Sequence, residues 1–349
     1  MSKATRRNKW LAKQPINRRL MAALTPCVAG SVYFFGWRSL AVLASTTLVA
    51  CIVEYLFARS RKEPLTEAVF VTSTIFALIM PPSVPWHVAA IGAGFAVMFG
   101  KEVFGGFGRN IFNPAMAGRC FVYVCFPVAL TGTWSPPAQG PWGALNRWTT
   151  APTAEATTGA TPMAHLKAGR LVLSNDPQAS NTIPFQLNEA ERVVLRKSTL
   201  LRALAWGRLS GTMGATSAFL ILIGGAYVFV TKTACRATII TLVTTYAVLN
   251  QLLYWFGVEP APGAWPAVLG GGFLFGAFFM ATDPVSSPRT RTARVLYAII
   301  IGVCTTVIRN FSIFNGGLMF SILIGNMFAP ILDYAVRTRQ ATSKEGAAP

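Results

Sequence analysis

The sequence predicts an all-α polytopic membrane protein with ten transmembrane helices, and three observations support this. Of its 349 residues, 53% are apolar and only 12% are charged, which is about half the charged share of a soluble domain. The apolar residues occur in runs and not in an alternating pattern, as spanning helices require. Lys and Arg are concentrated in alternate connections between the runs. The composition argues against a soluble globular enzyme and excludes a disordered chain.

Ten apolar segments follow one another along the chain. They cover residues 20–37, 39–57, 66–80, 86–100, 115–132, 214–231, 237–256, 264–282, 293–308 and 316–335. Several are close to the lower limit of about 17 residues for a transmembrane helix. The first run follows a basic stretch directly, so we expect no cleavable signal peptide.

The distribution of positive charge orients these segments. With the N-terminus inside, 21 of the 31 Lys and Arg fall in cytoplasmic segments, Arg119 among them, whereas the short outer loops hold only Arg38 and Arg309. The other eight lie in the stretch 133–213, which is too long for the positive-inside rule to govern. We therefore expect both termini in the cytoplasm, and we attribute the net charge of +19 to topology and not to nucleic-acid binding. Five tryptophans near the outer ends of the runs fit an aromatic belt, namely Trp37, Trp86, Trp134, Trp255 and Trp265.

Short motifs that recur along the chain indicate an internal repeat. The Arg-Asn pair at 109–110 returns at 309–310, and the proline-containing break at 80–82 has a counterpart at 282–284. Each copy would hold five segments, so the second copy would enter the membrane from the opposite side. Such an inverted repeat is the architecture of many transporters.

The expected organisation has five parts. They are a basic cytoplasmic N-terminus at 1–19, a first five-helix half at 20–132, an extracytoplasmic loop at 133–213, a second five-helix half at 214–335 and a cytoplasmic tail at 336–349. Within the loop, the pattern from Asn188 to Leu209 predicts an amphipathic helix that lies on the outer interface.

The outer loop contains a candidate attachment site for a flavin. Residues 155–161 read Glu-Ala-Thr-Thr-Gly-Ala-Thr, and the small Gly159 and Ala160 leave room for a modifying enzyme to reach Thr161. A phosphoester bond at Thr161 would anchor FMN covalently, and the flavin would carry electrons. A plain polar turn is the alternative interpretation. The same tripeptide recurs and ends at Thr216, which is the second candidate for attachment.

Acidic residues near the membrane are candidates for an ion pathway, because buried acids in a bilayer are costly and often functional. Glu67, Glu102, Asp283 and Asp333 fall at inner ends of the predicted segments, and carboxylates suit Na⁺ or a proton relay. Structural alternatives exist for these acids. Glu67 could cap a first turn, Asp283 could form an Asp-Pro turn, and Asp333 could pair with a basic residue one turn later, Arg337. Glu54 could extend to the interface from within the second segment.

The remaining polar motifs point to no metal site. The glycine-rich connection at 100–110 suits either a tight re-entrant turn or a compact inner loop. His87 and His165 stand alone, without the spacing of metal ligands. The six cysteines contain no CxxC pair, so we expect neither an iron–sulfur cluster nor a disulfide framework built from this chain alone.

Four stretches together resemble one protein family. They are Lys101–Gly106 (Lys-Glu-Val-Phe-Gly-Gly), Arg109–Ala115 with its Asn-Pro-Ala end, Met280–Ser286 (Met-Ala-Thr-Asp-Pro-Val-Ser) and Ile308-Arg309. The chain resembles the membrane flavoprotein subunits of respiratory ion pumps, over about residues 15–340. The two branches of this family are the NqrB subunits of the Na⁺-translocating NADH:quinone reductase and the RnfD subunits of the Rnf complex. The resemblance implies a ten-helix fold in the bacterial inner membrane.

The resemblance also implies two flavins. One is a covalent FMN on the last Thr of an Asp-x-x-Ser/Thr-Gly-Ala-Thr motif, attached by an extracytoplasmic flavin transferase. Thr161 matches the attachment position, with Thr158, Gly159 and Ala160 before it, and Glu155 replaces the usual Asp. The other is a non-covalent riboflavin, for which we name no residues.

The function expected from the resemblance is electron transfer coupled to ion transport. Electrons would pass from FMN toward ubiquinone within a complex of several subunits, coupled to Na⁺ movement past Glu67, Asp283 or Asp333. The sequence of Lys101–Gly106 favours the quinone reductase branch. Residues 161–163 are nearer to the RnfD subunit of the Rnf ferredoxin:NAD oxidoreductase, which is the alternative. A solute channel or transporter without a redox role is a further alternative, because inverted repeats suit it as well.

Overall fold

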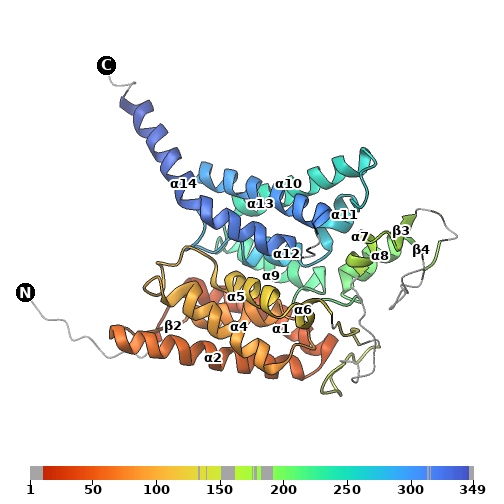
Figure 1. Ribbon diagram of the computed structural model, residues 1–349, viewed down its shortest axis with the longest axis horizontal. Helices are drawn as coiled ribbons and strands as arrows, with labels where there is room; N and C mark the ends of the chain where they lie inside the picture. The colour runs from red at the N-terminus through yellow and green to blue at the C-terminus, as the bar shows by residue number, and fades with distance from the viewer. Residues whose placement is uncertain are drawn as a thin grey trace, which may run out of the picture.

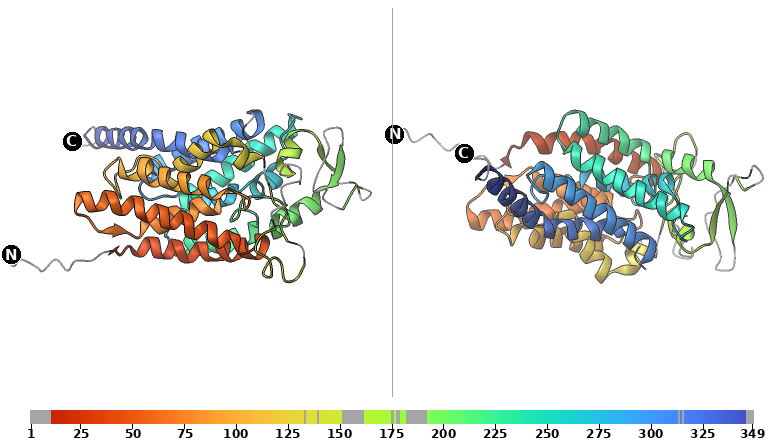
Figure 2. Two further views of the ribbon diagram at one scale, coloured as in Figure 1. Left: turned by 60° about the horizontal axis from the view of Figure 1, so that its bottom comes forward. Right: turned by 90° about the horizontal axis from the view of Figure 1, so that it is seen from above.

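Helices form nearly all of the regular structure, as the apolar runs predict. The computed structural model describes residues 11–132, 134–138, 140–150, 162–174, 176, 179–181, 192–312, 314 and 316–345. The long helices run mainly along one axis of the molecule (Figure 1). The chain enters and leaves at one end of this axis, and the short elements α7, α8, β3 and β4 lie at the other end (Figure 2).

The first half contains five main helices. They are α1 (Pro15–Phe35), α2 (Arg38–Arg61), α3 (Ala68–Leu78), α4 (Trp86–Val97) and α5 (Pro114–Cys125). A π-helix, η1 (Met98–Glu102), continues α4, and the short α6 (Pro127–Thr131) follows α5. Two-residue strands β1 (Leu11–Ala12) and β2 (Leu65–Thr66) pair in parallel beside α3.

The start of α5 shows how local sequence sets a helix boundary. The side chain of Asn113 accepts hydrogen bonds from the backbone N–H groups of Ala115 and Met116, at 3.1 and 3.4 Å. Pro114 occupies the first helical position, where its missing N–H costs nothing. This cap fixes the direction in which α5 enters the bundle.

The second half repeats the neighbour relations of the first. It contains α9 (Ala218–Val230), α10 (Arg236–Trp255), α11 (Ala264–Leu269), α12 (Phe273–Phe279), α13 (Arg291–Phe311) and α14 (Gly317–Glu345). Helix α2 packs against α3 and α4, as α10 packs against α11 and α13. Helix α4 packs against α5, as α13 packs against α14. Helices α1 and α9 join the two halves.

Four of the described helices are long and apolar enough to cross a bilayer by length and composition. They are Arg38–Arg61, Arg236–Trp255, Arg291–Phe311 and Gly317–Thr342. The other predicted segments are also helical, but their helices are shorter, interrupted or less apolar. Helix α3 stops before Pro81 and Pro82, and three glycines at 270–272 separate α11 from α12. The number of ten spans therefore stays a prediction.

The extramembrane stretch differs from its prediction. The helix predicted from Asn188 to Leu209 is wrong at Val193–Arg196, which forms strand β4, and α8 covers Lys197–Trp206. Its first residues, 188–191, lie outside the described residues. Strand β4 pairs in parallel with β3 (Leu171–Ser174), which follows the six-residue helix α7 (Pro162–Lys167). Paired β-branched residues favour the extended backbone here. The buried Leu195 and Leu200 hold β4 and α8 on one small hydrophobic core.

Two further boundaries differ from those expected. Helix α14 continues to Glu345, so the residues of the predicted tail up to that point are helical. Arg119, which we counted with the inner connections, lies within α5. The division of the chain into five parts otherwise stays a prediction.

Candidate functional site

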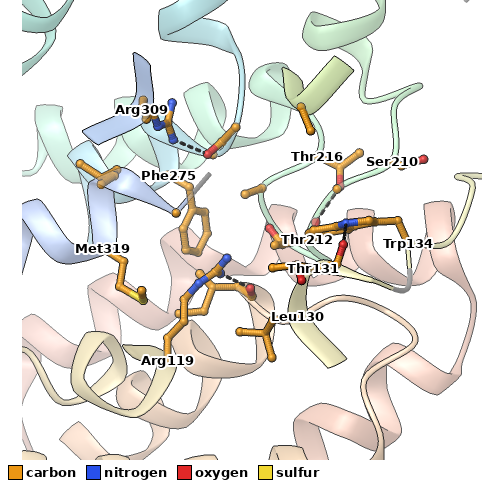
Figure 3. A pocket seen from close by; sticks show the side chains of 18 of the residues that line it. Arg119, Leu130, Thr131, Trp134, Ser210, Thr212, Thr216, Phe275, Arg309 and Met319 are labelled. Atoms are coloured by element: carbon orange, nitrogen blue, oxygen red, sulfur yellow. Dashed lines mark hydrogen bonds between the residues drawn. The ribbon is translucent and has the colours of Figure 1, made fainter. Parts of the chain in front are cut away.

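A cavity of about 210 Å³ lies where the two halves meet, toward the end of the molecule that carries α7 and α8 (Figure 3). Its walls come from α3, α5 and α6 of the first half and from α12, α13 and α14 of the second. The connection between α8 and α9 closes another side.

Two arginines give the cavity a positive wall. Arg119 donates a hydrogen bond to the carbonyl of Ile79, at the end of α3. Arg309 donates from Nη2 to the carbonyl of Gly271 at 2.6 Å and from Nη1 to the hydroxyl of Tyr246 at 3.3 Å. None of the described residues that line the cavity is Asp or Glu. Two cations without a lining acid favour an anionic or electron-rich occupant.

The position of the Arg309 guanidinium depends on the absence of a side chain at Gly271. Gly271 has φ +58°, and a Cβ at this position would lie 3.1 Å from Nη2 of Arg309. The Nε of Arg309 is buried and has no hydrogen-bond acceptor among the described residues. A buried N–H group without an acceptor is energetically costly.

The remaining walls are apolar and aromatic. Tyr123, Phe275 and Met319 line the cavity, and the indole of Trp134 closes it beside Thr131, whose carbonyl accepts the indole N–H at 3.0 Å. A flat aromatic ligand would find apolar faces here and hydrogen-bond donors at one edge. This combination is typical of pockets for small molecules and cofactors.

The predicted attachment site is close in sequence to a residue that lines this cavity, but it lies outside the described residues. Thr158, Gly159, Ala160 and Thr161 all lie in the undescribed range 151–161. Ala164, three residues after Thr161, lines the cavity. The second candidate, Thr216, also lines it, but its hydroxyl is buried and donates to the carbonyl of Thr212 at 2.6 Å. An enzyme would therefore have poor access to the Thr216 hydroxyl.

The four candidate ion-pathway acids do not form one cluster. Among the described residues no three His, Cys, Asp or Glu lie close enough together to hold a metal ion. Glu67 is bound by Arg18, with 2.6 Å between Oε1 and Nη2, and by the backbone N–H of Gln14, also at 2.6 Å. Asp333 accepts hydrogen bonds from the backbone N–H groups of Arg289 and Thr290, at 2.7 and 2.9 Å. It therefore binds the two residues that directly precede α13.

Asp283 is the acid nearest to the junction of the halves. Its carboxylate accepts hydrogen bonds from the backbone N–H and hydroxyl of Ser286, at 3.1 and 2.6 Å. It lines a second, smaller cavity of about 50 Å³ with Asn113 and the hydroxyl-bearing Thr72 and Thr282. Helix α12 and the residues after it connect the two cavities, because Met280 lines the larger one.

Glu102 belongs to a buried polar network that sequence reasoning missed. Its partner Lys101 pairs with Glu54, which is only 2% exposed, so Glu54 does not extend to the interface as one expectation had it. The signal available in the sequence was a Lys and two acids at the ends of apolar runs. Hydropathy alone does not tell which of these residues meet.

These features define a multi-pass membrane protein with a cavity between two helical halves. The chain belongs to the NQR2, RnfD, RnfE family, which it matches over residues 6–342. Its relatives include NqrB proteins, the B-type subunits of Na(+)-translocating NADH-quinone reductase. It is 36% identical over 315 residues to the NqrB protein of Azotobacter vinelandii, covering 88% of this chain and 68% of that protein. It is 34% identical over 330 residues to the one of Yersinia pestis, covering 91% and 71% of the two chains. The corresponding protein of Ectopseudomonas mendocina is 35% identical, with coverage of 88% and 68%.

Proposed function

We propose that this chain is an electron-transfer subunit of a Na⁺-translocating NADH:quinone oxidoreductase in the bacterial inner membrane, and that it carries FMN on Thr161. The observation that carries the proposal is the positive cavity between the halves, which Ala164 links in sequence to Thr161. The relatives named above are all subunits of this type of enzyme, which supports the quinone reductase branch over the RnfD branch. Membership of this family also weighs against a solute channel.

The residues of the cavity fit an isoalloxazine ring. Bound FMN would supply one- and two-electron transfer, chemistry that protein side chains do not provide. Arg119 and Arg309 line the cavity and would hold the polar edge of the ring. Phe275 and Tyr123 would cover its faces and exclude water. A non-covalent riboflavin is the other occupant that these walls suit.

The arrangement of the chain supports the proposed topology. The ends of the chain lie at one end of the molecule, and α7, α8 and the β3–β4 sheet lie at the opposite end (Figure 2). Cytoplasmic termini would therefore leave Thr161 on the outer side, where a flavin transferase works. The shared neighbour order of the two halves supports the inverted repeat.

We further propose that the acids conduct Na⁺ between the two sides. Glu67 and Glu102 would act near the inner surface, Asp283 at the junction of the halves, and Asp333 beside the start of α13. Because Met280 and Asp283 are three residues apart and line adjoining cavities, charge in the larger cavity would act on a cation at Asp283 over a short distance. Other subunits would deliver electrons and complete the path to ubiquinone.

In-gel fluorescence of the denatured chain tests the proposal. After expression with the partner subunits and the flavin transferase, the wild-type band should fluoresce, and Thr161→Ala should abolish the signal. The matched control is Thr216→Ala, which should stay fluorescent because that hydroxyl is buried and hydrogen-bonded.

A dark wild-type band in an assembled complex would contradict the covalent flavin. Fluorescence lost in Thr216→Ala and kept in Thr161→Ala would move the attachment to Thr216. Quinone-linked NADH oxidation that requires Na⁺ should accompany the fluorescent band. Oxidation of reduced ferredoxin in its place would assign the chain to the Rnf branch.

A further inference from the structure

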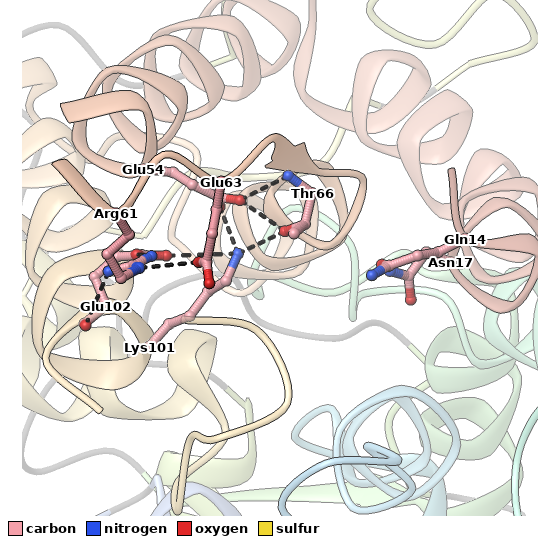
Figure 4. A network of polar contacts seen from close by, with 8 residues as sticks. All are labelled: Gln14, Asn17, Glu54, Arg61, Glu63, Thr66, Lys101 and Glu102. Atoms are coloured by element: carbon pink, nitrogen blue, oxygen red, sulfur yellow. Dashed lines mark hydrogen bonds and ion pairs between the residues drawn. The ribbon is translucent and has the colours of Figure 1, made fainter. Parts of the chain in front are cut away.

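A buried network of charged residues lies at the inner end of the first half, away from the cavity described above (Figure 4). At its centre is the ammonium of Lys101. Its Nζ lies 2.5 Å from Oε2 of Glu54, 2.8 Å from Oγ1 of Thr66 and 3.8 Å from Oε1 of Glu102. The side chains of Lys101, Glu54 and Glu102 are each at most 2% exposed. The three oxygens converge on one enclosed cation.

A second layer separates this centre from solvent. Arg61 binds Oε2 of Glu102 through Nη2, and its Nε lies 3.0 Å from Oε2 of Glu63. The side chains of Arg61 and Glu63 are 25% and 47% exposed. The ring of Phe107, from the glycine-rich connection, lies 6.0 Å from the Lys101 ammonium. An ion pair at the surface therefore covers a site that is buried beneath it.

The network is short of positive charge. The three glutamates outnumber the two cations, and Oε1 of Glu102 has no hydrogen-bond donor among the described residues. A buried carboxylate oxygen without a donor is unfavourable and marks a place for a ligand. Carboxylate and hydroxyl oxygens are the donors that hard cations prefer. The site thus has the donors of a small-cation site, with a lysine ammonium in the position of the ion.

Local backbone structure places these residues. Lys101 and Glu102 are the last residues of the π-helix η1, and such wide turns are frequent at functional sites. Glu54 comes from α2, and its Oε1 accepts the backbone N–H and hydroxyl of Thr66, at 2.9 and 2.6 Å. One helix, one strand and one π-turn therefore contribute one oxygen-bearing side chain each.

We propose that Glu54, Thr66 and Glu102 form a Na⁺ site in which the Lys101 ammonium is a tethered competitor. Na⁺ would bind between the carboxylates when the ammonium swings away, so the number of cations facing them stays the same in both states. The exchange would make occupancy by Na⁺ reversible at the inner surface. This inference rests on the proposed function, since it assumes that the complex handles Na⁺. The alternative is that Glu54 and Lys101 form an ion pair that only holds α2 and η1 together, and the experiment must distinguish this from a Na⁺ site.

Thermal stability of the purified whole complex, measured against NaCl or choline chloride at equal ionic strength, tests the proposal. Lys101→Met removes the competitor and leaves two buried carboxylates facing each other. We expect NaCl to raise the melting temperature of this variant. The Na⁺ concentration that gives half of this rise should be about tenfold lower for the variant than for the wild type. The charge-retaining control Lys101→Arg should behave as the wild type does.

The double variant Lys101→Met with Glu54→Gln restores the charge balance and removes one ligand, so it should assemble and lose the Na⁺ response. If Lys101→Met assembles only when cells are grown in Na⁺ while the double variant assembles without it, the site is supported. An equal response of Lys101→Met to choline and Na⁺ would overturn it. Flavin fluorescence and NADH oxidation, measured on the same preparations, report the proposed function separately. A Na⁺-stabilised variant in a complex whose turnover ignores Na⁺ would support the site and contradict that function.

Discussion

The two arginines of the cavity hold helix carbonyls and face the same space. Arg119 binds the carbonyl of Ile79 at the end of α3, and Arg309 binds that of Gly271 between α11 and α12. Each guanidinium thus meets carbonyl groups exposed at a helix break, where the helix dipole is negative. The arginines are fixed by these bonds before any ligand arrives, so a ligand need not order them.

Substitution of Arg309 should change the redox behaviour of a flavin in this cavity. Arg309→Met removes a positive charge, which would otherwise favour the reduced, more negative flavin. We expect its midpoint potential to fall by about 60 mV, a tenfold change for one electron. Spectroelectrochemical titration of the purified complex measures this potential. Arg309→Lys keeps the charge and should stay near the wild-type value, and an unchanged potential in Arg309→Met would contradict the assigned occupant.

Hydropathy predicts the helices of this chain but misses their breaks and the short strands. Apolar runs predicted where helices occur, because burial in a bilayer or a core demands them over many residues. They did not predict that α11 and α12 are separate helices or that 193–196 is a strand. Both features depend on a few residues, three glycines and two paired valines, inside stretches whose average composition hardly changes. Partners that meet from distant elements, such as Glu54 and Lys101, leave no pattern along the chain.

Helix α7 contains a buried histidine that should make the outer elements sensitive to acid. Burial lowers the pKa of His165 below its usual 6.5, and the nearby Arg170 lowers it further. Neither ring nitrogen has a hydrogen-bond partner among the described residues. The unfolded segment therefore binds a proton more readily than the folded one. The neutral imidazole of His165 therefore contributes to the stability of the folded segment above about pH 6.5. This contribution is lost as the pH falls toward the lower pKa of His165 in the folded state.

Hydrogen exchange of residues 162–174 should accordingly speed up between pH 7 and pH 5, after correction for the intrinsic pH dependence of exchange. His165→Gln should flatten this response, since glutamine does not titrate. The exposed His87 serves as the control, and His87→Gln should leave the response of 162–174 as in the wild type. An unaltered pH response in His165→Gln would assign the acid sensitivity to another group.

At the scale of the whole molecule, the opposite placement of α7 and the C-terminal end of α14 gives a direct test of topology. Ala168 directly follows α7, Ala341 lies in the last turns of α14, and both are exposed. The two elements lie toward opposite ends of the molecule (Figure 2). In intact spheroplasts, a cysteine in Ala168→Cys should react with a membrane-impermeant maleimide. A cysteine in Ala341→Cys should react only after permeabilisation. Labelling of both in intact cells would exclude cytoplasmic termini with an outer loop.

Helix α14 runs from the cavity toward the end of the molecule at which α1 begins (Figure 2). Leu318 and Met319, at its beginning, line the cavity, and the helix runs on for 29 residues to Glu345. At about 1.5 Å per residue it is some 43 Å long, longer than the ~30 Å hydrocarbon layer. Pro330 lies within the helix and lacks the N–H group that would continue its hydrogen-bond ladder. If an occupant of the cavity tilts the first turn, the stretch before Pro330 carries that tilt toward the other end of the molecule. A spectroscopic label beyond Pro330 would measure whether the tilt reaches the distal tip.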